Sequence, residues 1–145
     1  MIIEILSAFF GCFGITLVFH LYKDMKLTFV SCLIGSIGWS IYLLTDFYNN
    51  PFLQSFIAMC IVALLAEISA RIFKAPAIVF TMIGFFPLVP GKGIYDTMLH
   101  AISGEHVLFV SSFLETLGIS IALALGILTV STVFHIYKKI KLLSK

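Results

Sequence analysis

The chain has 145 residues, of which 61% are hydrophobic and only 11% are charged, and its formal net charge is +2. Its mean hydropathy is +1.13. A soluble domain has about 25% charged residues, so this chain has too few charges to cover a surface that faces water. We therefore expect a single all-α integral membrane domain over residues 1–145, embedded in a lipid bilayer. The sequence has no basic patch of the kind that would indicate a nucleic-acid partner.

Five apolar runs follow one another along the chain: Ile2–Tyr22, Leu27–Tyr48, Phe52–Phe73, Pro76–Ile102 and Val107–Tyr137. A hydrocarbon core about 30 Å thick is crossed by roughly 20 helical residues. The sequence therefore predicts about five transmembrane helices. The first run is expected to be a span and not a cleaved signal peptide, because Glu4 stands where a signal peptide has basic residues.

The basic residues gather on one side of the membrane when the connections are numbered alternately. Eight of the nine fall on the same side: Lys23, Lys26, Arg71, Lys74, Lys138, Lys139, Lys141 and Lys145. The positive-inside rule makes that side cytoplasmic, which predicts an outside N-terminus and a cytoplasmic C-terminus. A four-span arrangement, with a re-entrant fourth segment, would place the C-terminal lysines outside and is disfavoured.

The fourth run is interrupted by the stretch from Pro87 to Gly93, Pro-Leu-Val-Pro-Gly-Lys-Gly. Pro87 and Pro90 cannot donate a backbone hydrogen bond, and the glycines permit conformations closed to other residues. About ten helical residues after Pro76 rise roughly 15 Å, so we expect the break at membrane depth. Two half-helices of this kind build binding sites in many transporters. A proline kink, or a short helix followed by an outer loop, is the alternative.

Lys92 lies between Gly91 and Gly93 at the start of the expected second half-helix. Its cation, together with the exposed N–H groups of that helix end, would suit a substrate carboxylate. Lys92 could equally extend to the outer interface. Asp96 and His100 follow at helical spacing on the same face. Asp96 would balance Lys92, hold a substrate ammonium or carry a proton, or it would be an outer-surface acid.

Two further carboxylates are candidates for proton or ion coupling beside Asp96. Glu67 lies inside the third run, and intramembrane carboxylates are usually functional. However, Arg71 follows four residues later, so a structural ion pair is the alternative. Glu115 lies near the outer end of the fifth run, at a depth that favours the interface over the membrane centre.

The remaining features indicate packing and not chemistry. Cys12, Cys32 and Cys60 lie far apart in apolar runs, which predicts neither a metal site nor disulfides. No enzyme motif or cofactor motif is present, so catalysis is not expected. Trp39 and Tyr42 are among the aromatic residues expected at the membrane interface. Glycines that repeat within runs one, two and five predict close helix packing: Gly11, Gly14, Gly35, Gly38, Gly118 and Gly126.

Three stretches resemble one known family. Pro76–Met98, with its Pro-Leu-Val-Pro-Gly core and the Tyr95 that follows, resembles the signature of the threonine/serine exporter family, in its C-terminal half. Leu33–Gly38 and Ser112–Thr116 are also similar to that family's pattern. The resemblance covers nearly the whole chain. It shifts the expected substrate contact from the Lys92 side chain toward the backbone at Pro90 and Gly91.

The resemblance implies a subunit of an exporter of small hydrophilic metabolites in the inner membrane of a bacterium, and we expect the proton gradient to drive it. Its small-molecule substrate would be threonine and serine, or a dicarboxylate such as succinate. It also implies a larger membrane partner that carries the family's N-terminal half, and it is compatible with an oligomer. The expected substrate-binding residues are Pro87, Pro90, Gly91, Lys92, Gly93, Tyr95 and Asp96. The alternative is a membrane scaffold or assembly protein that does not transport.

Overall fold

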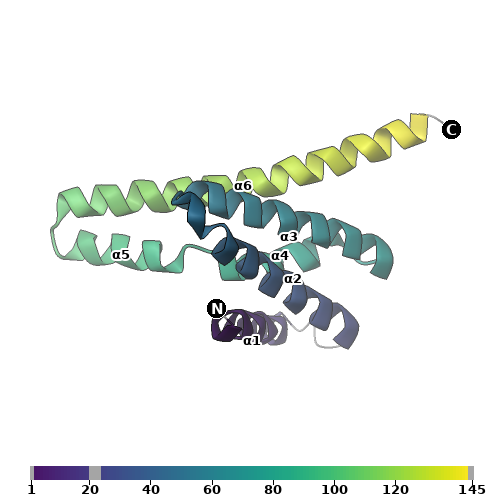
Figure 1. Cartoon of the computed structure of the whole chain (residues 1–145), viewed down its shortest axis with the longest axis horizontal. Helices are drawn as coiled ribbons and strands as arrows, with labels where there is room; N and C mark the ends of the chain where they lie inside the picture. The colour runs from purple at the N-terminus through teal and green to yellow at the C-terminus, as the bar shows by residue number, and fades with distance from the viewer. Residues whose placement is uncertain (1, 20–23, 144–145) are drawn as a thin grey trace.

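The computed structural model describes residues 2–19 and 24–143, and within this part it is all helical. Tyr22, Lys23 and Lys145, which entered the predictions above, lie outside the described residues. The elements run in the order α1 (Ile2–Val18), α2 (Met25–Leu44), η2 (Asp46–Tyr48), α3 (Pro51–Phe73), α4 (Ala77–Phe85), η3 (Phe86–Leu88), α5 (Gly91–Ile102) and α6 (His106–Leu143) (Figure 1).

Local chemistry sets the ends of α3. The Asn50 side chain accepts hydrogen bonds from the N–H groups of Phe52 (3.1 Å) and Leu53 (3.3 Å), and Pro51 occupies the first turn. This is a complete N-cap, because proline needs no partner there. At the other end Lys74 adopts a left-handed conformation, with φ of 53°. Pro76 follows, so the chain turns into α4 and does not continue α3.

The core lies where α2, α3, α4 and α6 meet. Its buried side chains come from all four helices and from η3, and they include Ile34, Val62, Phe80, Leu88 and Leu123. Small residues allow the helices to approach. A Cβ at Gly84 would lie 2.7 Å from Val62 Cγ1, and one at Gly126 would lie 2.9 Å from Met59 Cβ. Helices in lipid associate through such close packing, since no hydrophobic effect separates them from acyl chains.

The glycine prediction holds for runs two and five and not for run one. A Cβ at Gly35 would collide with Cys12, one at Gly38 with Val62, and one at Gly118 with Phe52. Gly11 and Gly14, by contrast, have no neighbouring atom within 4 Å in the described part of the chain. Helix α1 is instead attached through buried Cys12, which packs with Cys32 and Ile83.

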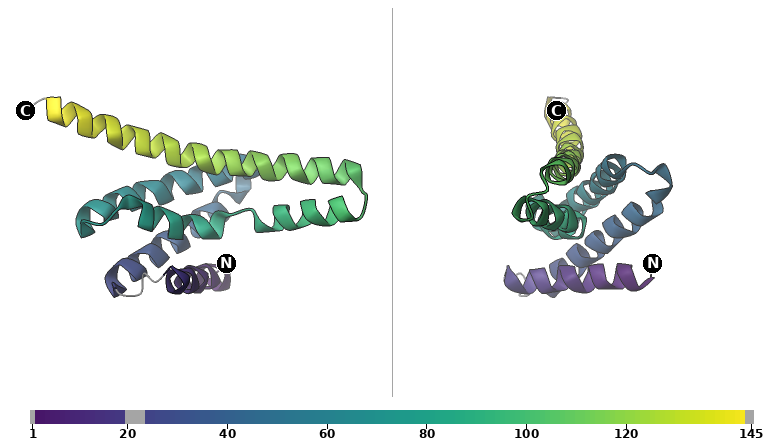
Figure 2. Two further views of the ribbon diagram at one scale, coloured as in Figure 1. Left: turned by 180° about the vertical axis from the view of Figure 1, so that it is seen from behind. Right: turned by 90° about the vertical axis from the view of Figure 1, so that its left-hand side faces the viewer.

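The number of spans follows from helix length. Three helices are long and apolar enough to cross a membrane, and α4 with α5 would make a fourth as a bent pair. Helix α1 has 17 residues and runs across the direction of α6 in the end-on view of Figure 2. The described structure therefore gives a multi-span helical bundle with three or four candidate spans, and the count of five stays a prediction.

Helix α6 reaches well past its neighbours. Its 38 residues rise about 57 Å. The Gly118 position packs on Phe52, in the first turn of α3, so the residues of α6 before it extend beyond α3. There they pair with α5, and Gly104, with φ of 74°, makes the turn between the two helices. This α5–α6 hairpin forms one end of the molecule (Figure 1). Arg71, Lys74 and Lys138 lie at the other end, which we call the basic end.

Candidate functional site

The fourth run is broken and not merely kinked. Helix α4 ends at Phe85, a 3-10 turn covers Phe86–Leu88, and α5 starts at Gly91 in a direction bent by 54°. Val89 is extended, with ψ of 129°. The break therefore falls within the predicted stretch from Pro87 to Gly93. The expected reason was wrong in one respect, because neither Gly91 nor Gly93 has a positive φ and both lie inside the first turn of α5.

Gly93 is required for a different reason, the approach of α5 to α6. A Cβ at Gly93 would lie 2.5 Å from Thr116 Oγ1 and 3.5 Å from Thr116 Cβ. That hydroxyl is held in place, since it donates to the Ser112 carbonyl at 2.7 Å. A Cβ at Gly91 would meet no atom within 4 Å. The two glycines beside Lys92 thus differ, one being packed and the other open.

A cavity of about 500 Å³ lies against the break, and we call it the break cavity. Helices α2, α3, α5 and α6 all contribute to it, together with η3. Its polar and charged lining consists of Ser55, Lys92, Asp96, Ser112, Glu115 and Thr116. The break itself contributes the continuous stretch from Pro87 to Gly93. Of the seven residues predicted to bind substrate, six therefore line one cavity.

The charges of the break cavity come from two facing helices. Lys92 and Asp96 are one turn apart on α5, and Glu115 stands on α6. Asp96 is half-buried, whereas Lys92 and Glu115 are exposed. One cation and two carboxylates give the cavity a formal charge of −1 with all three ionised. Such a set can hold an ammonium group and a carboxylate of the same small molecule.

The first turn of α5 adds backbone donors. The Gly91 N–H donates to the Val89 carbonyl (2.7 Å), and the Ile94 N–H to the Pro90 carbonyl (3.0 Å). The N–H groups of Lys92 and Gly93 belong to the first turn, which has no carbonyl partner within the helix. Pro90, at the N-cap, has no side-chain oxygen to accept from them. A carboxylate is the natural partner for such a helix N-terminus.

Two aromatic residues that line the break cavity were assigned to the membrane interface from the sequence. Trp39 and Tyr42 stack with ring centroids 5.4 Å apart and an interplanar angle of 16°. Their ring faces can attract a cation. The signal was present in the sequence, because Trp39 directly follows the glycine-rich segment of α2 that packs inside the bundle. Without the fold, however, nothing showed that this face met the break.

Three of the residues singled out lie elsewhere. Tyr95 is 66% exposed and does not line the break cavity. His100 shares a hydrogen bond of 2.8 Å with Glu105, at the turn of the α5–α6 hairpin. Glu67 lies toward the basic end, where its Oε2 accepts from Arg71 Nη1 at 2.9 Å. The structural alternative stated for Glu67 is thus the arrangement observed.

A family model described as Threonine/Serine exporter, ThrE, matches residues 4–133. The chain belongs to the threonine/serine exporter family. The match includes every residue of the break cavity. No curated protein and no solved structure gives a match.

Membership of the threonine/serine exporter family makes the chain a multi-pass membrane protein of a transporter family. A family of exporters also agrees with the prediction that the chain is not an enzyme. Among the described residues, no group of three or more His, Cys, Asp or Glu side chains is arranged to hold a metal ion.

Proposed function

We propose that this chain is the small subunit of a two-component exporter of threonine and serine in the inner membrane of a bacterium. The observation that carries the proposal is the coincidence of the family match with a cavity at the broken helix. The resemblance is to the C-terminal half of full-length members. We therefore propose a larger membrane subunit, carrying the N-terminal half, as the partner that completes the transport path.

The charges of the break cavity favour an amino acid over a dicarboxylate. A zwitterion can place its ammonium group between Asp96 and Glu115, near the faces of Trp39 and Tyr42, and its carboxylate at Lys92 and the first turn of α5. Succinate would bring two further negative charges to a cavity that already holds two carboxylates. Like charges repel, so a second substrate carboxylate placed near Asp96 or Glu115 would weaken binding.

Proton coupling is proposed for Asp96 and Glu115. Both are carboxylates that line the break cavity, so either can hold a substrate ammonium group or a proton there. Glu67 is a weaker candidate, because Arg71 already neutralises it. Its position toward the basic end also separates it from the substrate groups.

Five spans are proposed, with the N-terminus outside and the C-terminus in the cytoplasm. From Pro51 to Arg71, α3 rises about 30 Å, which equals the hydrocarbon thickness. Placing the basic end in the cytoplasm satisfies the positive-inside rule. Helix α1 lies across the direction of α6 and rises only about 25 Å, so its crossing requires it to turn toward the direction of the other helices, together with local thinning of the bilayer. Ile2→Cys in a cysteine-free variant tests this, because residue 2 starts α1 and an impermeant thiol reagent reaches it from outside only if α1 crosses.

The transport proposal is tested by efflux of labelled threonine, serine and succinate from cells that lack this gene and its partner, singly and together. We expect either deletion to abolish threonine and serine efflux and to leave succinate unchanged. Complementation with Asp96→Asn or Glu115→Gln should fail. Glu105→Gln is the matched control, because that carboxylate belongs to the same hairpin and bonds His100 outside the cavity. Unchanged efflux of all three compounds would instead support a scaffold that does not transport.

A further inference from the structure

A second hollow lies at the basic end, where α3, α4 and α6 meet. It has a volume of about 570 Å³, and we call it the basic groove. Small residues form part of its lining: Ala70 in the last turn of α3, Ala75 in the connection that follows, and Ala77 at the start of α4. Polar side chains line the rest of it: Glu67, Arg71, Tyr137 and Lys138. None of these residues lines the break cavity.

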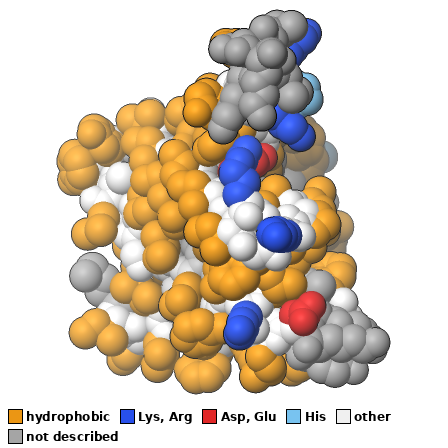
Figure 3. Space-filling model, turned by 90° about the vertical axis from the view of Figure 1, so that its right-hand side faces the viewer, with side chains coloured by type: hydrophobic (Ala, Val, Ile, Leu, Met, Phe, Trp, Pro, Cys, Tyr) orange, Lys and Arg blue, Asp and Glu red, His pale blue; other side chains and the backbone are white. Residues whose placement is uncertain are grey.

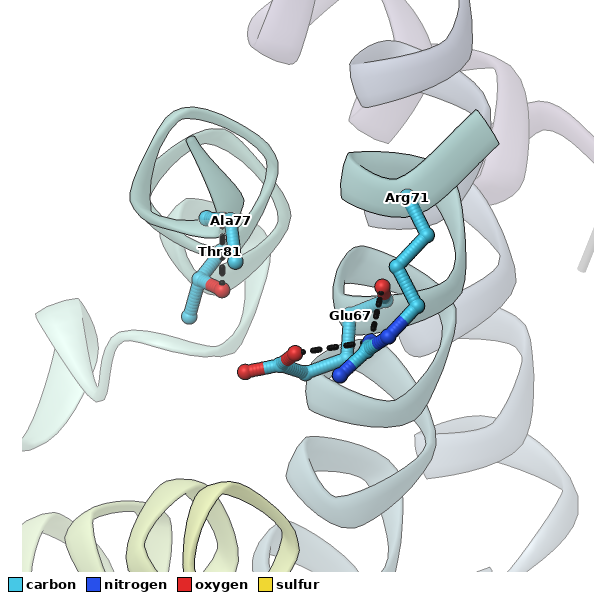
Figure 4. Close-up of polar contacts among 4 residues, drawn as sticks. All are labelled: Glu67, Arg71, Ala77 and Thr81. Carbon is cyan, nitrogen blue, oxygen red and sulfur yellow. Dashed lines mark hydrogen bonds and ion pairs between the residues drawn. The ribbon is translucent and has the colours of Figure 1, made fainter. Parts of the chain in front are cut away.

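Arg71 is fixed in position at this groove before any ligand arrives. Its Nη1 donates to Glu67 Oε2 at 2.9 Å and also to the Glu67 carbonyl. Its Cζ lies 4.4 Å from the centre of the Phe134 ring on α6, a cation–π contact. Figure 4 shows the side chain folded back over Glu67, whose carboxylate points into the space between α3 and α4. A guanidinium has five N–H donors, so Nε and Nη2 keep donors for a further acceptor.

The charge of the basic groove matches one phosphate diester. Arg71 and Lys138 supply two positive charges, and Glu67 supplies one negative charge. The resulting formal charge of +1 is opposite to the single negative charge of a phospholipid phosphate. Arginine binds phosphate oxygens with two parallel hydrogen bonds, while lysine acts as a point charge. The Arg71 side chain is 50% exposed, which leaves it accessible to such a group.

The surroundings of the groove indicate a lipid and not a dissolved anion. Three exposed isoleucines are close in sequence to the residues that line the groove: Ile72 on α3, and Ile136 and Ile140 on α6. The view of this end in Figure 3 shows Lys and Arg side chains standing among hydrophobic ones. The end of an apolar bundle where cations gather lies at the level of lipid headgroups. An acyl chain can then cover the isoleucines while the headgroup enters the groove.

We propose that the basic groove binds the phosphate of an anionic phospholipid headgroup, through Arg71 and Lys138. Basic pockets between transmembrane helices are suited to this use. The assignment does not depend on which substrate the break cavity takes, nor on transport. It adds a lipid-binding site at the opposite end of the molecule.

The test measures lipid retention by the delipidated, detergent-purified protein, using native mass spectrometry with phosphatidylglycerol, phosphatidylethanolamine or phosphatidylcholine. We expect phosphatidylglycerol to bind most tightly. Lys138→Gln should weaken its binding about fivefold, the effect of one Lys or Arg near an anionic surface. Lys139→Gln is the matched control, because the neighbouring lysine is exposed and does not line the groove. Arg71→Gln should weaken binding further, with Arg71→Lys recovering part of it.

Several results would overturn the proposal. Equal losses in Lys138→Gln and Lys139→Gln would show general surface charge instead of a groove. Equal retention of all three lipids would remove the role of the headgroup charge. A measurement with inorganic phosphate at millimolar concentration distinguishes a lipid headgroup from a dissolved phosphate ion. If inorganic phosphate displaces phosphatidylglycerol completely and stabilises the protein alone, the groove is a site for a soluble anion.

Discussion

The packing of Gly93 against Thr116 makes a sharp prediction about two glycines that flank one lysine. In Gly93→Ala, the new methyl group would lie 2.5 Å from Thr116 Oγ1, well inside contact distance. Thr116 cannot rotate away freely, because its hydroxyl donates to the Ser112 carbonyl at 2.7 Å. Helix α5 must therefore move from α6, or the hydroxyl must lose its hydrogen bond.

The size of the effect follows from two opposing contributions. Overpacking by one methyl group costs about 1–3 kcal/mol where neighbours cannot move. Replacing a helical glycine by alanine returns up to about 1 kcal/mol of backbone entropy. The net loss expected for Gly93→Ala is thus about 1–2 kcal/mol. For Gly91→Ala only the favourable contribution remains, so that variant should be as stable as the native protein or slightly more stable.

The measurement is thermal unfolding in detergent, followed by a thiol-reactive dye that labels Cys12 and Cys32 when they lose their burial. Gly93→Ala should unfold at a lower temperature than Gly91→Ala. Adding Thr116→Ala should restore stability, since it removes the oxygen while the remaining Cβ lies at an ordinary 3.5 Å. Equal midpoints for the two alanine variants, or no rescue by Thr116→Ala, would refute the close contact between α5 and α6.

Three further predictions concern the break cavity, the core and a helix end. Trp39→Ala should reduce threonine efflux strongly and Trp39→Phe only mildly, because phenylalanine keeps an aromatic face at the break cavity. Equal efflux from both variants would show that the aromatic face does not help to hold the substrate. Gly84→Ala places a methyl group 2.7 Å from Val62 Cγ1 and 3.0 Å from Ile34 Cγ2, so thermal unfolding should show a loss of about 1–3 kcal/mol. Adding Val62→Ala should partly offset that loss. If the effects of the two substitutions on the free energy of unfolding simply add, the contact is contradicted. Asn50→Ala removes the cap of α3 and should cost about 1 kcal/mol, while Asn50→Ser should cost less; equal midpoints would argue against capping.

The broken helix was predictable because its cause is local. Two prolines and two glycines within seven residues interrupt a helix whatever surrounds them. Which glycine matters was not predictable, because the answer depends on a residue 23 positions away in α6. Gly91 and Gly93 look alike in sequence, and only the α5–α6 hairpin places Thr116 against one of them.

The charged residues show the same division between local and long-range information. The pairing of Glu67 with Arg71 follows from a spacing of four residues on one helix, and it was stated as an alternative. The meeting of Asp96 with Glu115 and the stacked aromatic pair requires three helices to come together. Hydropathy could not show this, because Trp39 and Tyr42, in the last two turns of an apolar helix, match the pattern of aromatic residues at a membrane interface. The orientation of α1 across the direction of α6 could not be predicted either, because an apolar run of this length is typical of a transmembrane helix.

The position of the break cavity within the bundle constrains how an exporter subunit of this kind could work. The cavity touches Pro51 and Ser55, in the first turns of α3, so it lies near the polar connection between α2 and α3. Between it and the basic end stands the close-packed core of Ile34, Val62 and Phe80. A substrate that starts from the basic end must therefore either separate α4 from α2 and α3 at Gly84 or move along a face that a second chain covers. The first route predicts that Gly84→Ala changes the rate of efflux as well as the stability, because the new methyl group alters how α4 packs on α2 and α3. The second predicts that Gly84→Ala lowers stability alone, and on that route the larger subunit proposed above would form a wall of the path.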